Sequence, residues 1–330
     1  MLTQQDKEQL AKKGISEAQI ADQLASFEKG FPYLKLEAAA SIGHGIIAPE
    51  QAPYLTAWEE YKKGDARIVK FVPASGAASR MFKNLFEFLG GESEVPATDF
   101  EKKFFGNIAR FAFYDDLDAA CKKLHGKDIP TLIAEGQYKP IVATLLESAG
   151  LNYGQLPKGL LKFHSYDDGP RTPLEEHLVE GALYASGKTG QVNVHFTVSP
   201  EHRPLFEALV AEKAQKYAQK YGIAYNISFS EQKPSTDTVA ADMENKPFRN
   251  SDGSLLFRPG GHGALIENLN DLDADIVFIK NIDNVVPDRL KPETVTYKNL
   301  LAGVLVTLQK QAFDYHRLLD SGQYNQEQIE

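Results

Sequence analysis

The sequence predicts an α/β protein with a mostly parallel, Rossmann-like sheet that carries helices on both faces. Apolar strand patterns occur at residues 68–72, 191–198, 224–229 and 276–280, and helical patterns separate them. Parallel strands need such crossover helices, because the chain must return to the same edge of the sheet before the next strand begins. The first of these runs is nearly continuous in apolar residues, as expected for a strand buried on both faces.

Composition narrows the class of protein and its partners. The chain has 330 residues, 42% of them hydrophobic, and this is enough for one large domain or two ordinary ones. A net charge of -9 argues against a nucleic-acid or acidic-membrane partner, because both need a positive surface. Cys121 is the single cysteine, and the polar start lacks the apolar core of a signal peptide. We therefore expect a cytoplasmic protein with neither a nucleic acid nor a membrane as partner.

Helical patterns predict how the rest of the chain is organised. Residues 1–66 are expected to form an N-terminal helical segment that includes a short helix at 34–41. The α/β domain then covers residues 67–330. It carries a helical insertion at about 91–150 and ends in a long helix at about 291–328.

The most informative stretch, ARIVKFVPASGAASRM, covers residues 66–81. A strand leads into side chains that are too small to keep a ligand away from the backbone: Ala74, Ser75, Gly76, Ala77, Ala78 and Ser79. A helix expected from Met81 would direct its positive end at an anion, and the Arg80 guanidinium suits phosphate oxygens. This pattern predicts a phosphate-binding loop, although a tight packing turn between strand and helix would use the same small residues.

The stretch resembles the opening signature A-A-G-x-G-[ST]-R-M of nucleotidyltransferases of the sugar-nucleotide pyrophosphorylase type, which have a glycosyltransferase-A-like fold. The positions that fit are Ala74, Gly76, Ala77, Ser79, Arg80 and Met81. Ser75 replaces the second alanine of the signature, and Ala78 replaces its second glycine. The resemblance implies that Arg80 acts on the triphosphate and that the nucleotide is bound by Ala74, Ser75, Gly76, Ala77 and Ser79.

A second motif lies at residues 157–177. Pro157 and Lys158 precede an expected short strand at 160–163, and a helix is expected from Thr172 and Pro173. Pyrophosphorylases that this segment resembles have the same P-K pair, a strand and a P-L-[LI]-E-H helix. The resemblance implies that Lys158 contacts the reacting phosphates, whereas without it Lys158 could be an ordinary exposed lysine.

A third motif combines Gln232 with the glycine-rich stretch RPGGHG at residues 258–263. UDP-sugar pyrophosphorylases that it resembles have a glutamine soon after a strand and a P-x-G-[HN]-G loop, which together contact the edge of uracil. The resemblance implies that the base is bound by Gln232, Gly261, His262 and Gly263.

A fourth motif follows the last strand pattern, where Asp283 and Asn284 are expected at the carboxyl edge of the sheet. Mg²⁺ prefers one or two carboxylates together with phosphate oxygens and waters. The pair resembles the strand-end D-N of UDP-sugar enzymes, which implies that Asp283 binds the metal. A turn or a helix cap is the alternative interpretation of the same residues.

Together, the four motifs predict a sugar-nucleotide pyrophosphorylase-like protein, from a bacterial family of unknown function within that superfamily. The implied reaction transfers a nucleotidyl group, with UTP the favoured donor, to a sugar 1-phosphate and releases pyrophosphate in the presence of Mg²⁺. Two alternatives stay open. A glycosyltransferase would share the fold, but Val285 stands where an acid-x-acid metal motif would need its second acid. A degenerate, non-catalytic nucleotide-binding protein would fit Ala78 and the lack of a second metal-binding aspartate.

Overall fold

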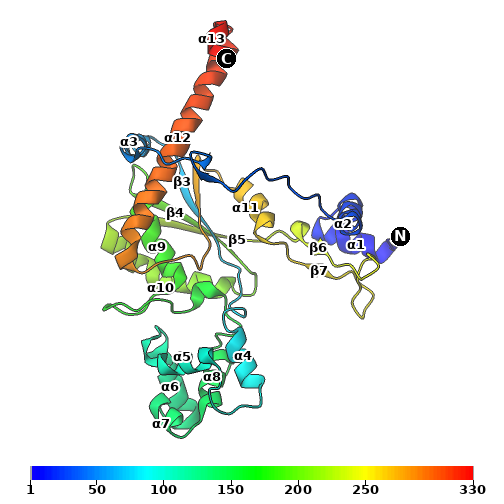
Figure 1. Cartoon of the computed structure of the whole chain (residues 1–330), viewed down its shortest axis with the longest axis vertical. Helices are drawn as coiled ribbons and strands as arrows, with labels where there is room; N and C mark the ends of the chain where they lie inside the picture. The colour runs from blue at the N-terminus through cyan, green and yellow to red at the C-terminus, as the bar shows by residue number, and fades with distance from the viewer. Residues whose placement is uncertain (1, 330) are drawn as a thin grey trace. The chain divides into compact units, whose positions relative to one another are not determined.

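The computed structural model describes residues 2–329 and divides into two compact units (Figure 1). The first unit combines the chain up to Thr56 with Ser230–Asp273. The second combines Ala57–Phe229 with the chain from Ala274 onward. This division differs from the expected boundary at residue 66, because residues 230–273 group with the N-terminal segment and not with the sheet that they follow.

The first unit has its own apolar core. Leu10, Ile15 and Ile20 are buried against Val239 and Leu255, and this contact joins the two parts of the sequence.

Helices α1 (Gln4–Lys13) and α2 (Glu17–Lys29) each begin with a capping box, in which a hydroxyl and the side chain three residues later satisfy backbone donors. The remaining elements are β1 (Ser41–Ile42), β2 (Gly45–Ile46), β6 (Thr238–Val239), β7 (Phe257–Arg258), η3 (Pro234–Thr236), η4 (His262–Leu265) and α11 (Ile266–Asn270).

The helix expected at residues 34–41 does not form. Residues 31–40 have no helical turn, and every one of them is exposed. A helix this short is unstable in water unless one face packs against another element, so these residues lack the burial that would stabilise it.

The second unit contains the sheet that the sequence predicts. Four strands lie in the order β5 (Ala224–Glu231), β4 (Gln191–Val198), β3 (Ile68–Pro73), β8 (Ile276–Ile279). Strand β3 pairs in parallel with β4 and with β8, and all six of its residues are buried. The expectation of an α/β protein with a parallel sheet is therefore confirmed.

Two apolar clusters pack on the sheet face to which Ile68 and Val72 point. One joins this face to α9 (Pro173–Tyr184) and α10 (Arg203–Tyr221). The other joins it to α3 (Gln51–Tyr61) and α12 (Lys291–Ser321), which has 31 residues. Helices on the opposite face stay a prediction. A short helix, α13 (Gln326–Ile329), follows α12.

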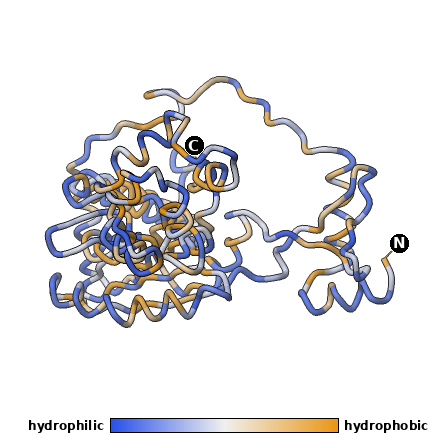
Figure 2. The backbone as a smooth tube through the Cα atoms, turned by 90° about the horizontal axis from the view of Figure 1, so that it is seen from below, coloured by the Kyte–Doolittle hydropathy of each residue, from blue (hydrophilic) through white to orange (hydrophobic). Residues whose placement is uncertain are grey.

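The predicted insertion is helical and has a separate apolar core, built around aromatic rings. Figure 2 shows hydrophobic and hydrophilic stretches alternating along the backbone.

The strand expected at residues 160–163 is absent. Residues 158–160 form a 3₁₀ turn, η2 (Lys158–Leu160), and Leu161 is buried in the insertion core. The helices that form this core are α4 (Lys83–Gly90), just before the predicted insertion, and then α5 (Asp99–Gly106), η1 (Ile108–Arg110), α6 (Tyr114–His125), α7 (Ile129–Ala134) and α8 (Tyr138–Leu146).

Helix α9 begins as the sequence predicts, and this start can be tested. The Thr172 hydroxyl accepts a hydrogen bond from the Glu175 backbone N–H at 3.3 Å, and the Glu175 carboxylate accepts one from the Thr172 N–H at 2.8 Å. We expect Thr172→Ala to lower the free energy of unfolding by about 1 kcal/mol, measured by urea denaturation. Thr172→Ser keeps the hydroxyl and should retain most of that stability. Equal losses in both variants would contradict the capping role.

Candidate functional site

The carboxyl ends of three neighbouring strands meet at one edge of the sheet. Backbone hydrogen bonds continue at this edge. The Ala74 N–H, just after β3, donates to the Thr197 carbonyl of β4 at 2.8 Å. The Ile282 N–H, in the turn after β8, donates to the Pro73 carbonyl at the end of β3 at 3.0 Å. The loop after β3 and the turn after β8 therefore start side by side. Open parallel sheets bind their ligands at this edge.

The loop after β3 alternates between buried and exposed small residues. Ala74 and Ala78 are fully buried, so packing explains why they are small. Gly76, Ala77 and Ser79 are exposed, and a Cβ atom added at Gly76 would meet nothing within 4 Å. A packing turn therefore does not account for these three residues.

The backbone of this loop offers free donors. Within residues 2–329, the N–H groups of Ser75, Gly76, Ala77 and Ser79 donate no hydrogen bond to the protein. Successive unpaired N–H groups can form an anion-binding concavity. The loop is thus open on the side from which a phosphate chain would approach.

The helix after the loop begins later than expected. Sequence analysis places its start at Met81, but α4 begins at Lys83. The intervening residues form a turn in which the Met81 N–H donates to the Ala78 carbonyl at 2.8 Å, and Phe82 packs into the insertion core. The helix therefore begins four residues after Ser79, and the unpaired donors described above belong to the loop itself.

Arg80 lies in this turn and is exposed. Its guanidinium makes no ion pair or hydrogen bond with any residue that the structure describes. An exposed guanidinium beside unpaired backbone donors adds a positive charge and five N–H groups to the same region.

The structure also brings Lys158 and Asp283 to this edge. The Lys158 N–H donates to the Gly76 carbonyl at 3.2 Å, which joins the second motif directly to the first. The Lys158 ammonium lies 2.5 Å from Asp283 Oδ2, with side chains 25% and 38% exposed. Three of the four motifs, separated by more than 200 residues in the sequence, therefore meet at one place.

Gly159 makes this approach possible, and sequence reasoning missed it. A Cβ atom at Gly159 would lie 2.7 Å from the Phe206 ring and 3.0 Å from the Ile282 side chain. Because no side chain intervenes, η2 packs closely on both residues. This contact holds Lys158 near the turn that carries Asp283.

Asp283 could take part in a magnesium site only together with ligand atoms. Within the described chain, no group of three or more His, Cys, Asp or Glu side chains is placed to hold a metal ion. Asp283 supplies one carboxylate, partly exposed at the edge where the loop donors lie. This donor set fits Mg²⁺, which commonly takes one protein carboxylate and completes its shell with phosphate oxygens and waters.

The third motif belongs to the first unit, and its own residues lie together. The Gln232 amide donates to the Gly260 carbonyl at 3.2 Å and to the Thr236 hydroxyl at 3.3 Å. Gly261, His262 and Gly263 are exposed beside it. The glutamine and the glycine-rich loop therefore form one group, as the sequence predicts.

A family model matches residues 3–330 of this sequence, almost its whole length. The chain belongs to the family Domain of unknown function (DUF4301). Comparisons with curated proteins and with solved structures give no match. Within residues 2–329, no helix is both long and apolar enough to cross a membrane.

A buried charge network lies behind the candidate site, and sequence reasoning missed it. Glu180 on α9 accepts hydrogen bonds from Lys70 at 3.0 Å and from Lys280 at 2.7 Å, and all three side chains are buried. Burial lowers the pKa of Lys70 to about 7. Burial alone would raise the pKa of Glu180, but Lys70, His177 and Lys280 together lower it to about 2. The only sequence signal was a lysine inside an otherwise apolar strand.

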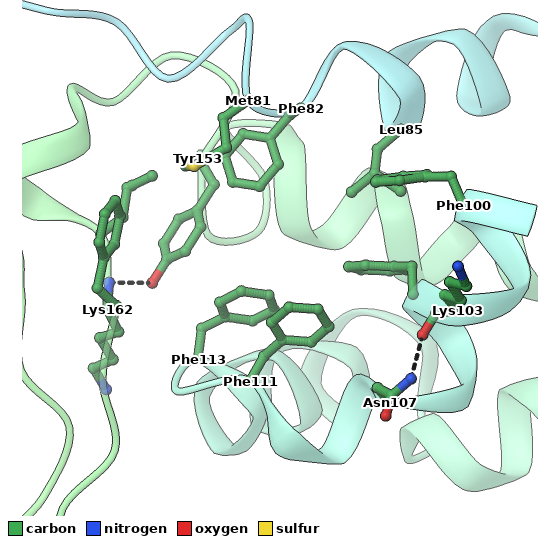
Figure 3. Close-up of a pocket in the computed structure, with 13 residues that line it drawn as sticks. Met81, Phe82, Leu85, Phe100, Lys103, Asn107, Phe111, Phe113, Tyr153 and Lys162 are labelled. Atoms are coloured by element: carbon green, nitrogen blue, oxygen red, sulfur yellow. Dashed lines mark hydrogen bonds between the residues drawn. The ribbon is translucent and has the colours of Figure 1, made fainter. Parts of the chain in front are cut away.

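An aromatic cavity of about 510 Å³ adjoins the turn after the loop (Figure 3). The rings of Phe82, Phe111, Phe113 and Tyr153 face this space, and the Tyr153 hydroxyl accepts a hydrogen bond from the Lys162 N–H at 3.2 Å. Burial raises the pKa of Tyr153 to about 12, so its phenol is neutral at physiological pH. Because its wall is mostly aromatic, the cavity does not extend the polar candidate site at the edge of the sheet.

The ion pair between Lys158 and Asp283 should matter little for stability. Partly exposed pairs contribute about 0–1 kcal/mol, because water and salt screen them. We expect Lys158→Met to change the free energy of unfolding by no more than about 1 kcal/mol in urea denaturation. A loss several times larger would show that the pair maintains the fold and is not kept for a ligand.

Glu180 should behave in the opposite way. Removing one partner of a buried ion pair costs about 3–5 kcal/mol, because the remaining charge stays buried. We expect Glu180→Gln to lose stability on this scale, since Lys70 and Lys280 would both lack a carboxylate. The control is Glu207→Gln on α10, where the carboxylate is 48% exposed. Similar stability in the two variants would contradict the assigned role of Glu180.

Proposed function

We propose that this protein is a nucleotidyltransferase that uses the edge formed by the Gly76 loop, Lys158 and Asp283. The observation that supports the proposal most strongly is the loop itself. Its exposed small residues and unpaired N–H groups have no packing role, yet they lie next to a lysine and a carboxylate. Such an arrangement suits a polyphosphate, because donors, cation and metal ligand converge on one place.

In the proposed reaction, an oxygen of a sugar 1-phosphate attacks the α-phosphorus of a nucleoside triphosphate. A new P–O bond forms as the bond from the α-phosphorus to the bridging oxygen breaks, and pyrophosphate leaves with the electron pair. This chemistry depends on positioning and charge neutralisation more than on a covalent nucleophile. Mg²⁺, when bound, would neutralise phosphate charge.

The residues have separate tasks in this proposal. The Gly76 loop and Arg80 bind the triphosphate, and Lys158 stabilises the negative charge that builds up on the reacting phosphates. When a nucleotide binds, the ion pair between Lys158 and Asp283 separates. Lys158 then contacts the phosphates, and the Asp283 carboxylate would be available to Mg²⁺. For Gln232, Gly261, His262 and Gly263, which belong to the first unit, base binding stays what the resemblance implies, with uracil favoured.

Nucleotide binding is tested by thermal unfolding with UTP, ATP, GTP and CTP, each with and without Mg²⁺. A ligand at about a hundred times its dissociation constant adds roughly 2.7 kcal/mol to stability. We expect a metal-dependent gain with UTP. Gly76→Val should abolish it without loss of fold, because the new side chain enters open space where the phosphates would lie. Gly90→Val, also at an unobstructed position, is the control. An equal gain in Gly76→Val and the wild type would exclude the loop.

Turnover is tested by the transfer of label from radioactive pyrophosphate into UTP in the presence of UDP-sugars. Lys158→Met and Asp283→Asn should each lower the rate by about a hundredfold or more, as expected when one preorganised charge is removed. Lys310→Gln, at an exposed lysine of α12, is the control. Nucleotide binding without exchange for any UDP-sugar would contradict the transferase and favour a non-catalytic nucleotide-binding protein.

A further inference from the structure

A cavity of about 460 Å³, lined by both polar and apolar side chains, lies between the end of β8 and the first turns of α12. Two lysines line it, together with amide and hydroxyl side chains: Lys280, Lys298, Asn281, Asn284, Thr294 and Tyr297. None of these residues belongs to the Gly76 loop or to the pair formed by Lys158 and Asp283. The cavity is therefore a separate candidate site within the second unit.

Positive charge exceeds negative charge beside this cavity. Glu180 is the carboxylate for both Lys70 and Lys280. Lys298 reaches no carboxylate within the described residues, and its ammonium lies 3.5 Å from the Ile279 carbonyl. Two lysines thus share one glutamate, and Lys298 has no carboxylate partner among the described residues.

Asp283, the acidic residue nearest to Lys280 in the sequence, does not balance this excess of positive charge. Asp283 lies in the turn between Asn281 and Asn284, but its carboxylate pairs with Lys158. Burial, and then repulsion from Lys280, lowers the pKa of Lys298. A half-buried ammonium without an anion is costly, and the cost falls when an anion binds to it.

We infer that this cavity binds a small oxyanion, held by the ammonium groups of Lys280 and Lys298 and by the amides of Asn281 and Asn284. Phosphate, sulfate and carboxylate groups share the required chemistry: negative charge and several acceptor oxygens. The two asparagines flank Asp283 in the sequence, so an anion here would contact the same turn that carries the proposed metal ligand. The inference does not depend on nucleotidyl transfer.

The first test follows Lys298 itself in the full-length protein. Acetic anhydride acetylates a trace of each accessible lysine, and peptide mass spectrometry gives the labelling rate of Lys298. This rate is measured at constant ionic strength while inorganic phosphate, sulfate or acetate is added. Phosphate at about ten times its dissociation constant should slow the labelling of Lys298 about tenfold, since only the free protein reacts. Lys310, exposed on the same helix, should label at an unchanged rate. Protection by phosphate and sulfate alone would define a tetrahedral-anion site, and protection by acetate as well would define a general one. Labelling of Lys298 that no anion slows would overturn the inference.

The second test separates this cavity from the Gly76 loop, which should also bind phosphate. Thermal unfolding with inorganic phosphate is compared in Lys298→Gln, Arg80→Gln and the control Lys310→Gln. Lys298→Gln should fold at least as well as the wild type without anion, because it removes an uncompensated charge, but it should lose part of the gain that phosphate gives. If Arg80→Gln loses the whole gain and Lys298→Gln loses none, phosphate binds only at the loop. That result would overturn the inference and leave the proposed function intact.

Discussion

The parallel pairing of β3 with β4 and β8 is the constraint on which the candidate site depends. Parallel strands end at the same edge, so the segments that follow them must begin together. The register places Pro73 opposite Thr197 and Phe71 opposite Ile279. The loop after β3 and the turn after β8 are neighbours for this reason. The Lys158 segment then joins them through the carbonyl of Gly76 and the close contact at Gly159.

The buried network of Lys70, Glu180 and Lys280 reinforces this register. Glu180 on α9 holds ammonium groups from two adjacent strands at once. A shift of β8 by one residue would turn Lys280 to the other face of the sheet and leave Glu180 with one partner fewer. The network therefore selects one alignment of strands, although replacing a buried ion pair with apolar residues often leaves stability unchanged.

Much of the local structure could be predicted from the sequence. Strand patterns, the start of a helix at Thr172 and Pro173, and the helical pattern of residues 91–150 depend on neighbouring residues, and the structure contains them. The four motifs were also visible, because each consists of one or two short stretches that can be recognised in the sequence.

What depends on distant contacts could not be predicted. Nothing in residues 230–273 indicates that Val239 and Leu255 pack against Leu10 and Ile20. Residues 34–41 have a helical pattern but no partner to bury it, and residues 160–163 look like a strand although Leu161 belongs to a helical core. Lys70 interrupts an apolar strand, and it is tolerated because Glu180 and the His177 carbonyl, both on α9, accept hydrogen bonds from its ammonium.

The divided first unit has a consequence for how this protein is made. Helices α1 and α2 leave the ribosome before the residues that cover their apolar face, because Val239 and Leu255 come more than 200 positions later. At about 5–20 residues per second, Leu10 and Ile20 wait roughly 10–50 s for their partners, while the whole segment from Ala57 to Phe229 emerges between them. During synthesis, the apolar face of α1 and α2 therefore stays uncovered until residues 239–255 emerge, and a chain interrupted before residue 239 keeps that face uncovered.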